Sequence, residues 1–152
     1  MPRTTASIVI PLPIAQVYEG SRDVEALLPH LPDAREITAL EKSPTRCVTK
    51  FVFVALGKKI MYTEEEDWDD ATYSNHFKQR DGDFDKYEGQ YLYKEVPDGT
   101  EFSIVLDWEL NLPLIGALLN KMLAKILENQ VVALTRGVKD VCLEKAAQKT
   151  AS

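Results

Sequence analysis

The stretch TEFSIVLDWEL, residues 100–110, alternates apolar and polar side chains over almost its whole length. The even positions from 102 to 110 are all apolar, whereas most odd positions are polar, namely Glu101, Ser103, Asp107 and Glu109. A period of two is typical of a strand with one buried face. The stretch therefore predicts a strand whose even-numbered residues line a core.

The same alternation extends upstream to about residue 34, where turn-forming sequences divide it into runs. The predicted strands span residues 34–42, 45–56, 59–69, 73–80, 84–96 and 100–110. Consecutive strands joined by short turns pair most simply as an antiparallel meander. An apolar β-branched run from Arg3 to Ile10, stopped by Pro11 and Pro13, predicts one further strand.

Helical spacing appears in three places outside the strands. Two short helices are expected after the first strand, one from Pro13 to Asp23 and one from Val24 to about Pro29. Residues 114–147 lack proline and place apolar side chains every third or fourth position, so they predict a helix of roughly 50 Å. Small residues along it let a sheet come close: Ala117, Ala124, Ala133 and Gly137.

The fold class predicted is therefore α+β, with a seven-stranded curved antiparallel sheet wrapped around a long C-terminal helix. The chain has 152 residues, of which 45% are hydrophobic and 28% charged, which is typical of one globular domain over residues 1–152. Residues 1–2 and 148–152 are expected to be frayed tails. A net charge of −6 disfavours nucleic acid and anionic lipid as partners.

No apolar stretch approaches the roughly 20 residues of a membrane-spanning helix, and the N-terminus lacks the apolar core of a secretory signal. A cytoplasmic protein is expected. Cys47 and Cys142 are not closely spaced and have apolar neighbours, so both are expected to be buried, reduced thiols.

The inner face of the predicted sheet is unusually polar. In 84–96 the odd set turns inward and brings three tyrosines, and in 73–80 the set with Asn75 and Gln79 does the same. In 59–69 the more apolar even set also carries Glu64 and Glu66 inward. A buried carboxylate without a partner costs several kcal/mol. Three explanations stay open: a wet cavity, partners for the two glutamates, or a phase that is wrong by one residue.

A cavity that holds water or a ligand would account for so many inward polar groups, and a tyrosine-rich core whose hydroxyls reach the sheet rim would do so equally well. The residues expected to line such a cavity come from the inner strand faces and from one face of the long helix. They are Tyr62, Trp68, Asn75, Phe77, Gln79, Tyr87, Tyr91, Tyr93, Phe102, Ile104, Leu106, Trp108, Leu119, Met122, Leu123 and Ile126.

The order of elements, together with three local sequences, resembles the START-like (helix-grip, Bet v 1-like) superfamily, in particular its polyketide cyclase/dehydrase and coenzyme-Q-binding-like branch. The sequences are SIVIPLPIAQVY (7–18), GDFDKYEGQYLY (82–93) and LPLIGALL (112–119). Members often have Trp where this chain has Tyr91. The resemblance implies a deep cavity between sheet and helix; members bind lipids, quinones, polyketides or plant hormones, and a minority are enzymes.

Other motifs point away from metal or cofactor chemistry, and neither a metal nor a cofactor is expected. The acidic run at 64–70 is split between two faces and is expected to be a solvated strand edge. Asp81, Asp83 and Asp85 lack the glycine and the glutamate of a calcium loop and are expected in a hairpin turn. His30 and His76 suit neither a metal site nor a catalytic triad.

The sequence favours binding or carriage of a hydrophobic small molecule: a lipid, quinone or polyketide-like compound. An alternative is a polyketide cyclase/dehydratase, with Glu64 or Glu66 as general base and Tyr62, Tyr87 or Tyr91 donating to a developing enolate. A second alternative is a protein-interaction or membrane-docking module that uses the apolar stretch 112–119 for transient contact. The oligomeric state is left open.

Overall fold

The computed structural model describes residues 3–111 and 116–151 of the chain. In chain order the elements are β1 (Arg3–Ile10), α1 (Ile14–Ser21), the 3-10 helix η1 (Val24–His30), β2 (Ala34–Lys42), β3 (Arg46–Ala55), β4 (Lys58–Asp69), β5 (Ser74–Gly82), β6 (Lys86–Val96), β7 (Gly99–Glu109) and α2 (Ala117–Ala151). The predicted α+β class and the two short helices after β1 are confirmed.

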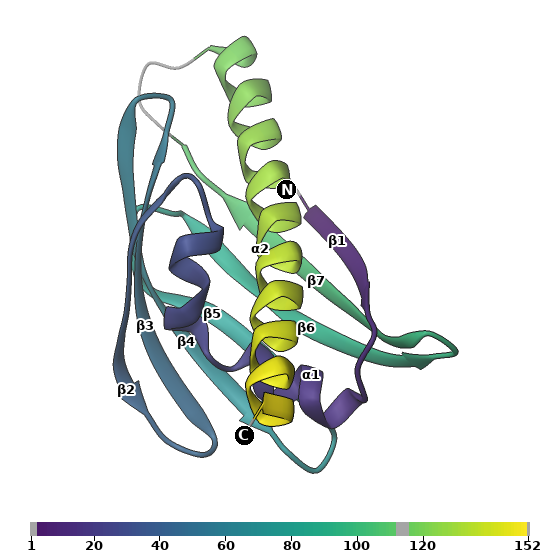
Figure 1. Cartoon of the computed structure of the whole chain (residues 1–152). Coiled ribbons are helices and arrows are strands. Elements are labelled where there is room, and N and C mark those ends of the chain that lie inside the picture. The colour runs from purple at the N-terminus through teal and green to yellow at the C-terminus, as the bar shows by residue number, and fades with distance from the viewer. Residues whose placement is uncertain (1–2, 112–115, 152) are drawn as a thin grey trace.

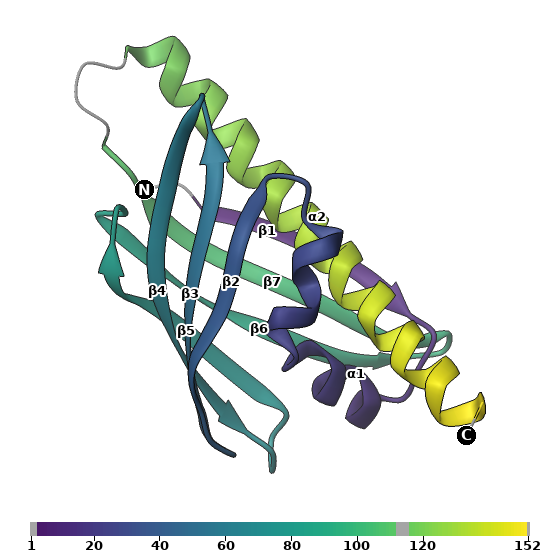
Figure 2. The same cartoon turned by 60° about the vertical axis from the view of Figure 1, so that its left-hand side comes forward.

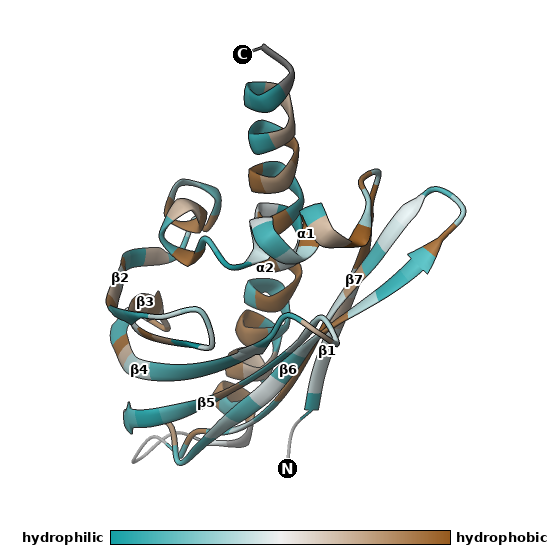
Figure 3. Cartoon of the chain, turned by 90° about the horizontal axis from the view of Figure 1, so that it is seen from below, coloured by the Kyte–Doolittle hydropathy of each residue, from teal (hydrophilic) through white to brown (hydrophobic). Residues whose placement is uncertain are grey.

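The sheet has seven strands in the order β1-β7-β6-β5-β4-β3-β2, and every neighbouring pair is antiparallel. Strands β2 to β7 form the predicted meander, and β1 pairs with β7 at the far edge. The sheet curves around α2, with β2 to β4 on one side of the helix and β1 and β7 on the other (Figure 3). This is the helix-grip arrangement.

Helix α2 crosses the concave face, and α1 packs near its C-terminal end (Figure 1). The side chains that α2 buries recur at spacings of three, four or seven residues, as the amphipathic pattern predicted. They include Leu123, Leu127, Val131, Val138 and Val141. Figure 2 shows the helix running along β1, and the helix also contacts β7 and η1. The helix ends at Ala151, beyond the predicted end at residue 147, and its predicted start at residue 114 lies outside the described residues.

From Ile60 to Trp68 the alternation in β4 buries the even-numbered residues and exposes or half-buries the odd ones. Glu64 is 3% exposed and Glu66 is fully buried, so the chosen phase was right. The expectation that the acidic run is a solvated strand edge was wrong, because β4 lies between β3 and β5 in the middle of the sheet. The predicted meander already placed this strand between two others, so a run of charged residues does not by itself indicate an edge strand.

Gly137 of α2 lies against η1, whereas the sequence suggested that it would lie against the sheet. A Cβ added there would lie 3.2 Å from His30 Cβ and 3.3 Å from Leu27 Cδ2. Both residues belong to η1. The lack of a side chain at Gly137 therefore allows α2 to approach η1 and not the sheet.

Gly89 of β6 allows its two neighbouring strands, β5 and β7, to lie close to it. An added Cβ would collide with the backbone oxygen of Val105 in β7 and would lie 2.7 Å from Phe77 Cζ. Because the backbone of a neighbouring strand cannot easily move, Gly89→Ala is expected to lower the free energy of unfolding by about 1–3 kcal/mol or more, measured by urea denaturation. Gly116→Ala, which meets nothing within 4 Å, is the control and should leave stability unchanged or slightly raised. Equal stability of the two variants would contradict the packing argument.

Candidate functional site

Two adjoining cavities lie between the concave face of the sheet, η1 and α2. The outer lobe has a volume of about 60 Å³ and the more enclosed inner lobe about 30 Å³. Their shared wall consists of Phe51, Tyr62, Tyr87, Leu106, Val131 and Leu134. The outer lobe adds Leu31, Ala34, Val52, Phe53, Phe84, Leu127 and Gln130, and the inner lobe adds Leu27, Glu64, Phe77, Tyr91 and Ile104.

The polar groups of the shared wall are two tyrosine hydroxyls. Tyr62 on β4 and Tyr87 on β6 are hydrogen-bonded through their hydroxyl oxygens, 3.1 Å apart. The Tyr62 ring stacks on Phe51 of β3 with a centroid distance of 5.0 Å. Burial raises the pKa of Tyr62, Tyr87 and Tyr91 above the usual tyrosine value. These hydroxyls are therefore neutral hydrogen-bonding groups in an otherwise apolar space.

Glu64 and Glu66 form a buried carboxyl pair beside the tyrosines. Burial, the neighbouring charge of Glu66 and a hydrogen bond to Glu66 raise the pKa of Glu64 well above its usual value, and a hydrogen bond with Tyr87 partly opposes this. Burial raises the pKa of Glu66 to about 7, against hydrogen bonds from Glu64 and Thr49 that favour its ionised form. The Thr49 hydroxyl donates to Glu66 Oε1 at 3.4 Å. The pair thus retains a proton at neutral pH, with Glu64 donating to Glu66.

Of the three explanations for the inward glutamates, hydrogen-bond partners apply and a wrong phase does not, since the phase is right. Glu64 borders the inner lobe, and both glutamates have partners. Some buried polar atoms of this cluster still lack a hydrogen bond. Glu66 Oε2 and both amide atoms of Asn75 have no hydrogen-bond partner among the described residues. Asn75 and Glu66 lie on the same face of neighbouring strands, two residue pairs apart.

The structure brings together the sheet residues of the predicted site only in part. Tyr62, Phe77, Tyr87, Tyr91, Ile104 and Leu106 all line the cavity, as does the candidate base Glu64. The others lie on the same concave face but do not line either lobe: Glu66, Trp68, Asn75, Gln79, Tyr93, Phe102 and Trp108. Several serve packing instead; for example, the Trp108 indole donates to the Thr4 hydroxyl at 3.1 Å.

The helix wall of the cavity starts later in α2 than the sequence suggested. Leu119 and Met122 are 37% and 45% exposed, and neither they nor Leu123 and Ile126 line the cavity. Leu127, Gln130, Val131 and Leu134 take that place. The helical period gives the apolar face of α2 but not the turn at which that face reaches the cavity.

Phe84 is a cavity residue that sequence reasoning missed. The predicted strand 84–96 gave its even positions an outward direction, but β6 begins at Lys86, so Phe84 lies in a turn. It is 4% exposed although Asp83 and Asp85 beside it are exposed. An aromatic side chain between two carboxylates in a turn was the signal that could have indicated a residue pointing inward.

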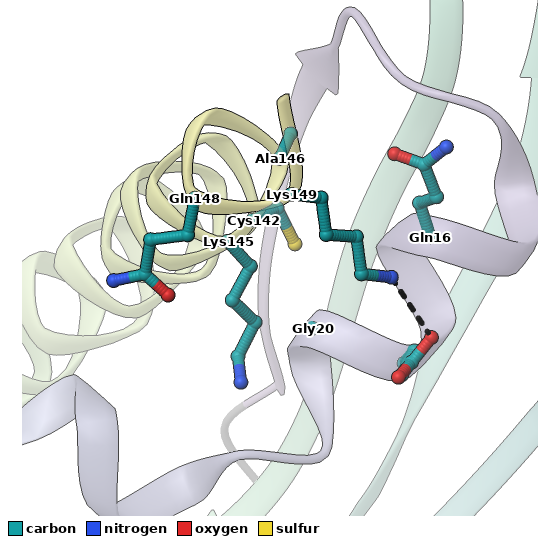
Figure 4. Close-up of a pocket in the computed structure, with 8 residues that line it drawn as sticks. Gln16, Gly20, Cys142, Lys145, Ala146, Gln148 and Lys149 are labelled. Atoms are coloured by element: carbon teal, nitrogen blue, oxygen red, sulfur yellow. Dashed lines mark ion pairs between the residues drawn. The ribbon is translucent and has the colours of Figure 1, made fainter. Parts of the chain in front are cut away.

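The two cysteines are free and buried, as predicted. Cys142 lies under an open groove between α1 and the end of α2, where Lys149 pairs with Glu19 at 3.8 Å (Figure 4). Burial raises the pKa of the Cys142 thiol to about 11, so it is not a ready nucleophile. No group of three or more potential metal ligands is found among residues 3–111 and 116–151.

The apolar stretch 112–119 is described only from residue 116. Leu118 is 72% exposed, and with Leu119 and Met122 it leaves the start of α2 apolar on its surface. Within the described part of the chain, no helix is both long and apolar enough to span a membrane.

Comparison with protein families and with solved structures gives the same fold, a sheet wrapped around a long C-terminal helix. Residues 10–135 match the family described as polyketide cyclase / dehydrase and lipid transport. The chain therefore belongs to this START-like family. A search of curated proteins found no match.

Among solved structures, the Thermus thermophilus protein TTHA0849 is 34% identical, with a TM-score of 0.89 over 95% of this chain and 99% of that one. The ZhuI aromatase/cyclase of Streptomyces sp. R1128 is 16% identical, with a TM-score of 0.83 over 95% of each chain. A START superfamily protein of Mycobacterium smegmatis is 19% identical, with a TM-score of 0.69 over 91% of this chain and 98% of that one. Family and fold together support a helix-grip domain that binds a hydrophobic ligand.

The carboxyl pair makes stability depend on pH. Unfolded glutamates ionise near pH 4.3, so above about that pH the unfolded state releases protons that the folded pair still holds. The free energy of unfolding should therefore fall as the pH rises through the raised pKa values, by at most about 1.4 kcal/mol per pH unit for each proton. The double variant Glu64→Gln/Glu66→Gln should show less of this fall in urea denaturation between about pH 5 and 8.

Glu65→Gln is the matched control on the same strand. The Arg80 guanidinium holds the pKa of Glu65 below its usual value, so this variant should keep the fall in stability above about pH 5. The same pH slope in the double variant and in the unmodified protein would show that the pair holds no extra proton.

Proposed function

We propose that this protein binds a small, largely apolar molecule that carries a neutral oxygen group, such as a phenol, quinone or ketone. The observation that supports it most directly is the polar cluster of Tyr62, Tyr87 and Glu64 in a cavity whose other walls are almost entirely apolar. Apolar walls with a few placed polar groups are typical of small-molecule sites. The class includes the quinones and polyketide-like compounds suggested by the sequence.

Neutrality of the ligand follows from the charges around the cavity. The hydroxyls of Tyr62 and Tyr87 stay protonated, and the Glu64–Glu66 pair already carries up to one negative charge in a desolvated place. A second anion nearby would be repelled strongly because the interior screens charge poorly. A ketone or phenol can accept or donate a hydrogen bond here without adding charge.

The size of the cavity requires that its walls move on binding. Ligand pockets commonly have volumes of about 300–1,000 Å³. The two lobes, at about 60 and 30 Å³, are far smaller. The structure therefore corresponds to a closed form, and a lipid or polyketide-like molecule would have to displace η1, α2 or the β5–β6 turn.

Calorimetric titration with 4-ethylphenol and 4-ethylbenzoate tests the proposed ligand class. The phenol should bind, and the benzoate should bind at least tenfold more weakly. Tyr62→Phe and Tyr87→Phe should each weaken phenol binding by roughly two- to twelvefold, the range that corresponds to one hydrogen bond. Tyr73→Phe, whose ring packs on Tyr18 away from the cavity, is the control and should bind normally.

Native mass spectrometry of protein purified without detergent, followed by organic extraction, would identify a ligand that co-purifies. A quinone, lipid or polyketide-like mass in stoichiometric amount supports carriage. Equal affinity for the benzoate and the phenol would contradict the proposed class.

The carboxyl pair favours acid–base catalysis as a second candidate function, of the cyclase or dehydratase type in the family's description. In the dehydration of a β-hydroxy ketone, a base removes the proton α to the carbonyl while an acid protonates the departing hydroxyl. Glu64 lies at the cavity, and Glu66 behind it shares its proton. Such a pair can give and take a proton near neutral pH.

A conjugated enone formed from a β-hydroxy aryl ketone can be followed by its absorbance. Glu66→Gln should keep the affinity for 4-ethylphenol, and Glu64→Gln should still bind it because the amide retains hydrogen-bonding groups. Both variants should lose turnover, because an amide of similar shape cannot exchange the proton. Full turnover in both glutamine variants would exclude this assignment.

A further inference from the structure

The turn between β5 and β6, residues 83–85, closes the outer lobe, and it is called the flap below. Its central residue, Phe84, is 4% exposed and lines the outer lobe. The Phe84 ring packs against Tyr87, Tyr62 and Phe53, with centroid distances of 4.9, 5.4 and 6.4 Å. A turn residue thus occupies space at the wall of the cavity that a ligand could otherwise take.

Ladder pairing between β5 and β6 stops just before the flap. The pairs run from Asn75 with Tyr91 to Lys78 with Glu88. After that point β5 pairs with β4, while the first residues of β6 pair with β7. The two strands therefore separate beside the cavity, and the backbone between them needs other partners.

The Gln79 side chain provides those partners for the centre of the flap. Its Nε2 donates to the Phe84 backbone oxygen at 2.8 Å, and the Phe84 N–H donates to Gln79 Oε1 at 3.1 Å. One amide thus replaces a pair of ladder hydrogen bonds. Both backbone polar groups of Phe84 are thus bonded to this single side chain.

The ends of the flap are held differently, by strands. The Asp83 N–H donates to Met61 O at 2.9 Å, and Asp83 Oδ2 accepts from the Met61 N–H at 2.8 Å. The Asp85 N–H donates to Glu109 O at 2.8 Å, and Asp85 Oδ2 accepts from the Asn111 N–H at 2.7 Å. The centre can therefore change while both ends stay attached to β4 and to the end of β7.

We propose that Phe84 limits the length of the ligand and that Gln79 is the positioning residue that holds Phe84 in place. The inference rests on the proposed function, since it states which ligands of that class fit. A short ligand leaves Phe84 in the cavity. A longer one must push the ring outward and break both Gln79 hydrogen bonds.

Calorimetric titration with phenol, 4-ethylphenol, 4-butylphenol and 4-hexylphenol tests this limit. In the unmodified protein the affinity should rise with chain length and then level off. In Phe84→Ala the affinity should continue to rise by about fourfold for each buried methylene. The space left by the ring should accept the longer chain, because apolar cavities of about 150 Å³ accept benzene-sized ligands. Phe84→Leu, which keeps a buried apolar side chain, should shift the limit less and serves if the alanine variant does not fold.

Gln79→Met keeps the length of the side chain but removes both hydrogen bonds, so it should extend the chain-length limit in the same direction as Phe84→Ala. Gln148→Met, an exposed position on α2, is the matched control and should bind as the unmodified protein does. Hydrogen exchange gives a readout independent of binding: the Phe84 amide should exchange faster in Gln79→Met, while the Asp83 and Asp85 amides stay protected.

The outcomes separate the two proposals. Binding of alkylphenols with the same length limit in every variant would overturn the role of Phe84 and leave the proposed function standing. An unchanged exchange rate of the Phe84 amide in Gln79→Met would overturn the role of Gln79. If no alkylphenol binds to any variant, the proposed function fails, and this inference fails with it.

Discussion

Burial of two carboxyl groups on a central strand is the constraint on which the concave face depends. The period of two that buries Ile60, Tyr62 and Trp68 also buries Glu64 and Glu66. A slip of one residue would free the glutamates but would expose the entire apolar set. The register is therefore fixed by the apolar residues, and the carboxyl groups are stabilised by retaining a proton and by hydrogen bonds to each other, Thr49 and Tyr87.

That arrangement determines what the cavity can offer chemically. A proton kept within the pair prevents two full charges from facing each other, and the tyrosine hydroxyls above it remain protonated. Weak screening inside the protein makes each of these hydrogen bonds count more than it would in water. The same groups that are costly to bury thus give an otherwise largely apolar cavity its polar face, formed by Glu64 at the inner lobe and by Tyr62 and Tyr87 in the wall that both lobes share.

Periodicity predicted the strands and their inner faces well because each strand's pattern reports directly which side is buried. The short turns between consecutive strands predicted the meander, but the acidic run of β4 was interpreted from its charges alone and was therefore wrongly expected at an edge. Periodicity could not fix the turn of α2 that meets the cavity, because the position of a helix along a sheet is a tertiary property; Leu119 and Met122 were chosen where Leu127 and Val131 lie. Phe84 was missed because a turn residue follows neither period.

The closed cavity leaves the question of which walls can move. The sheet side is held by continuous backbone ladders, apart from the place where β5 and β6 separate. On the other side, Leu27 of η1 and Leu31, directly after η1, line the cavity. Helix η1 is attached to α2 by packing at Gly137 and by His30, whose two nitrogens lie 3.5 and 3.4 Å from carboxylates of Asp140 and Glu144. These partly exposed pairs are weak compared with a strand ladder. Opening should therefore begin at η1 and at the centre of the flap, where Phe84 is held by the Gln79 side chain, while the sheet keeps Tyr62, Tyr87 and Glu64 in place.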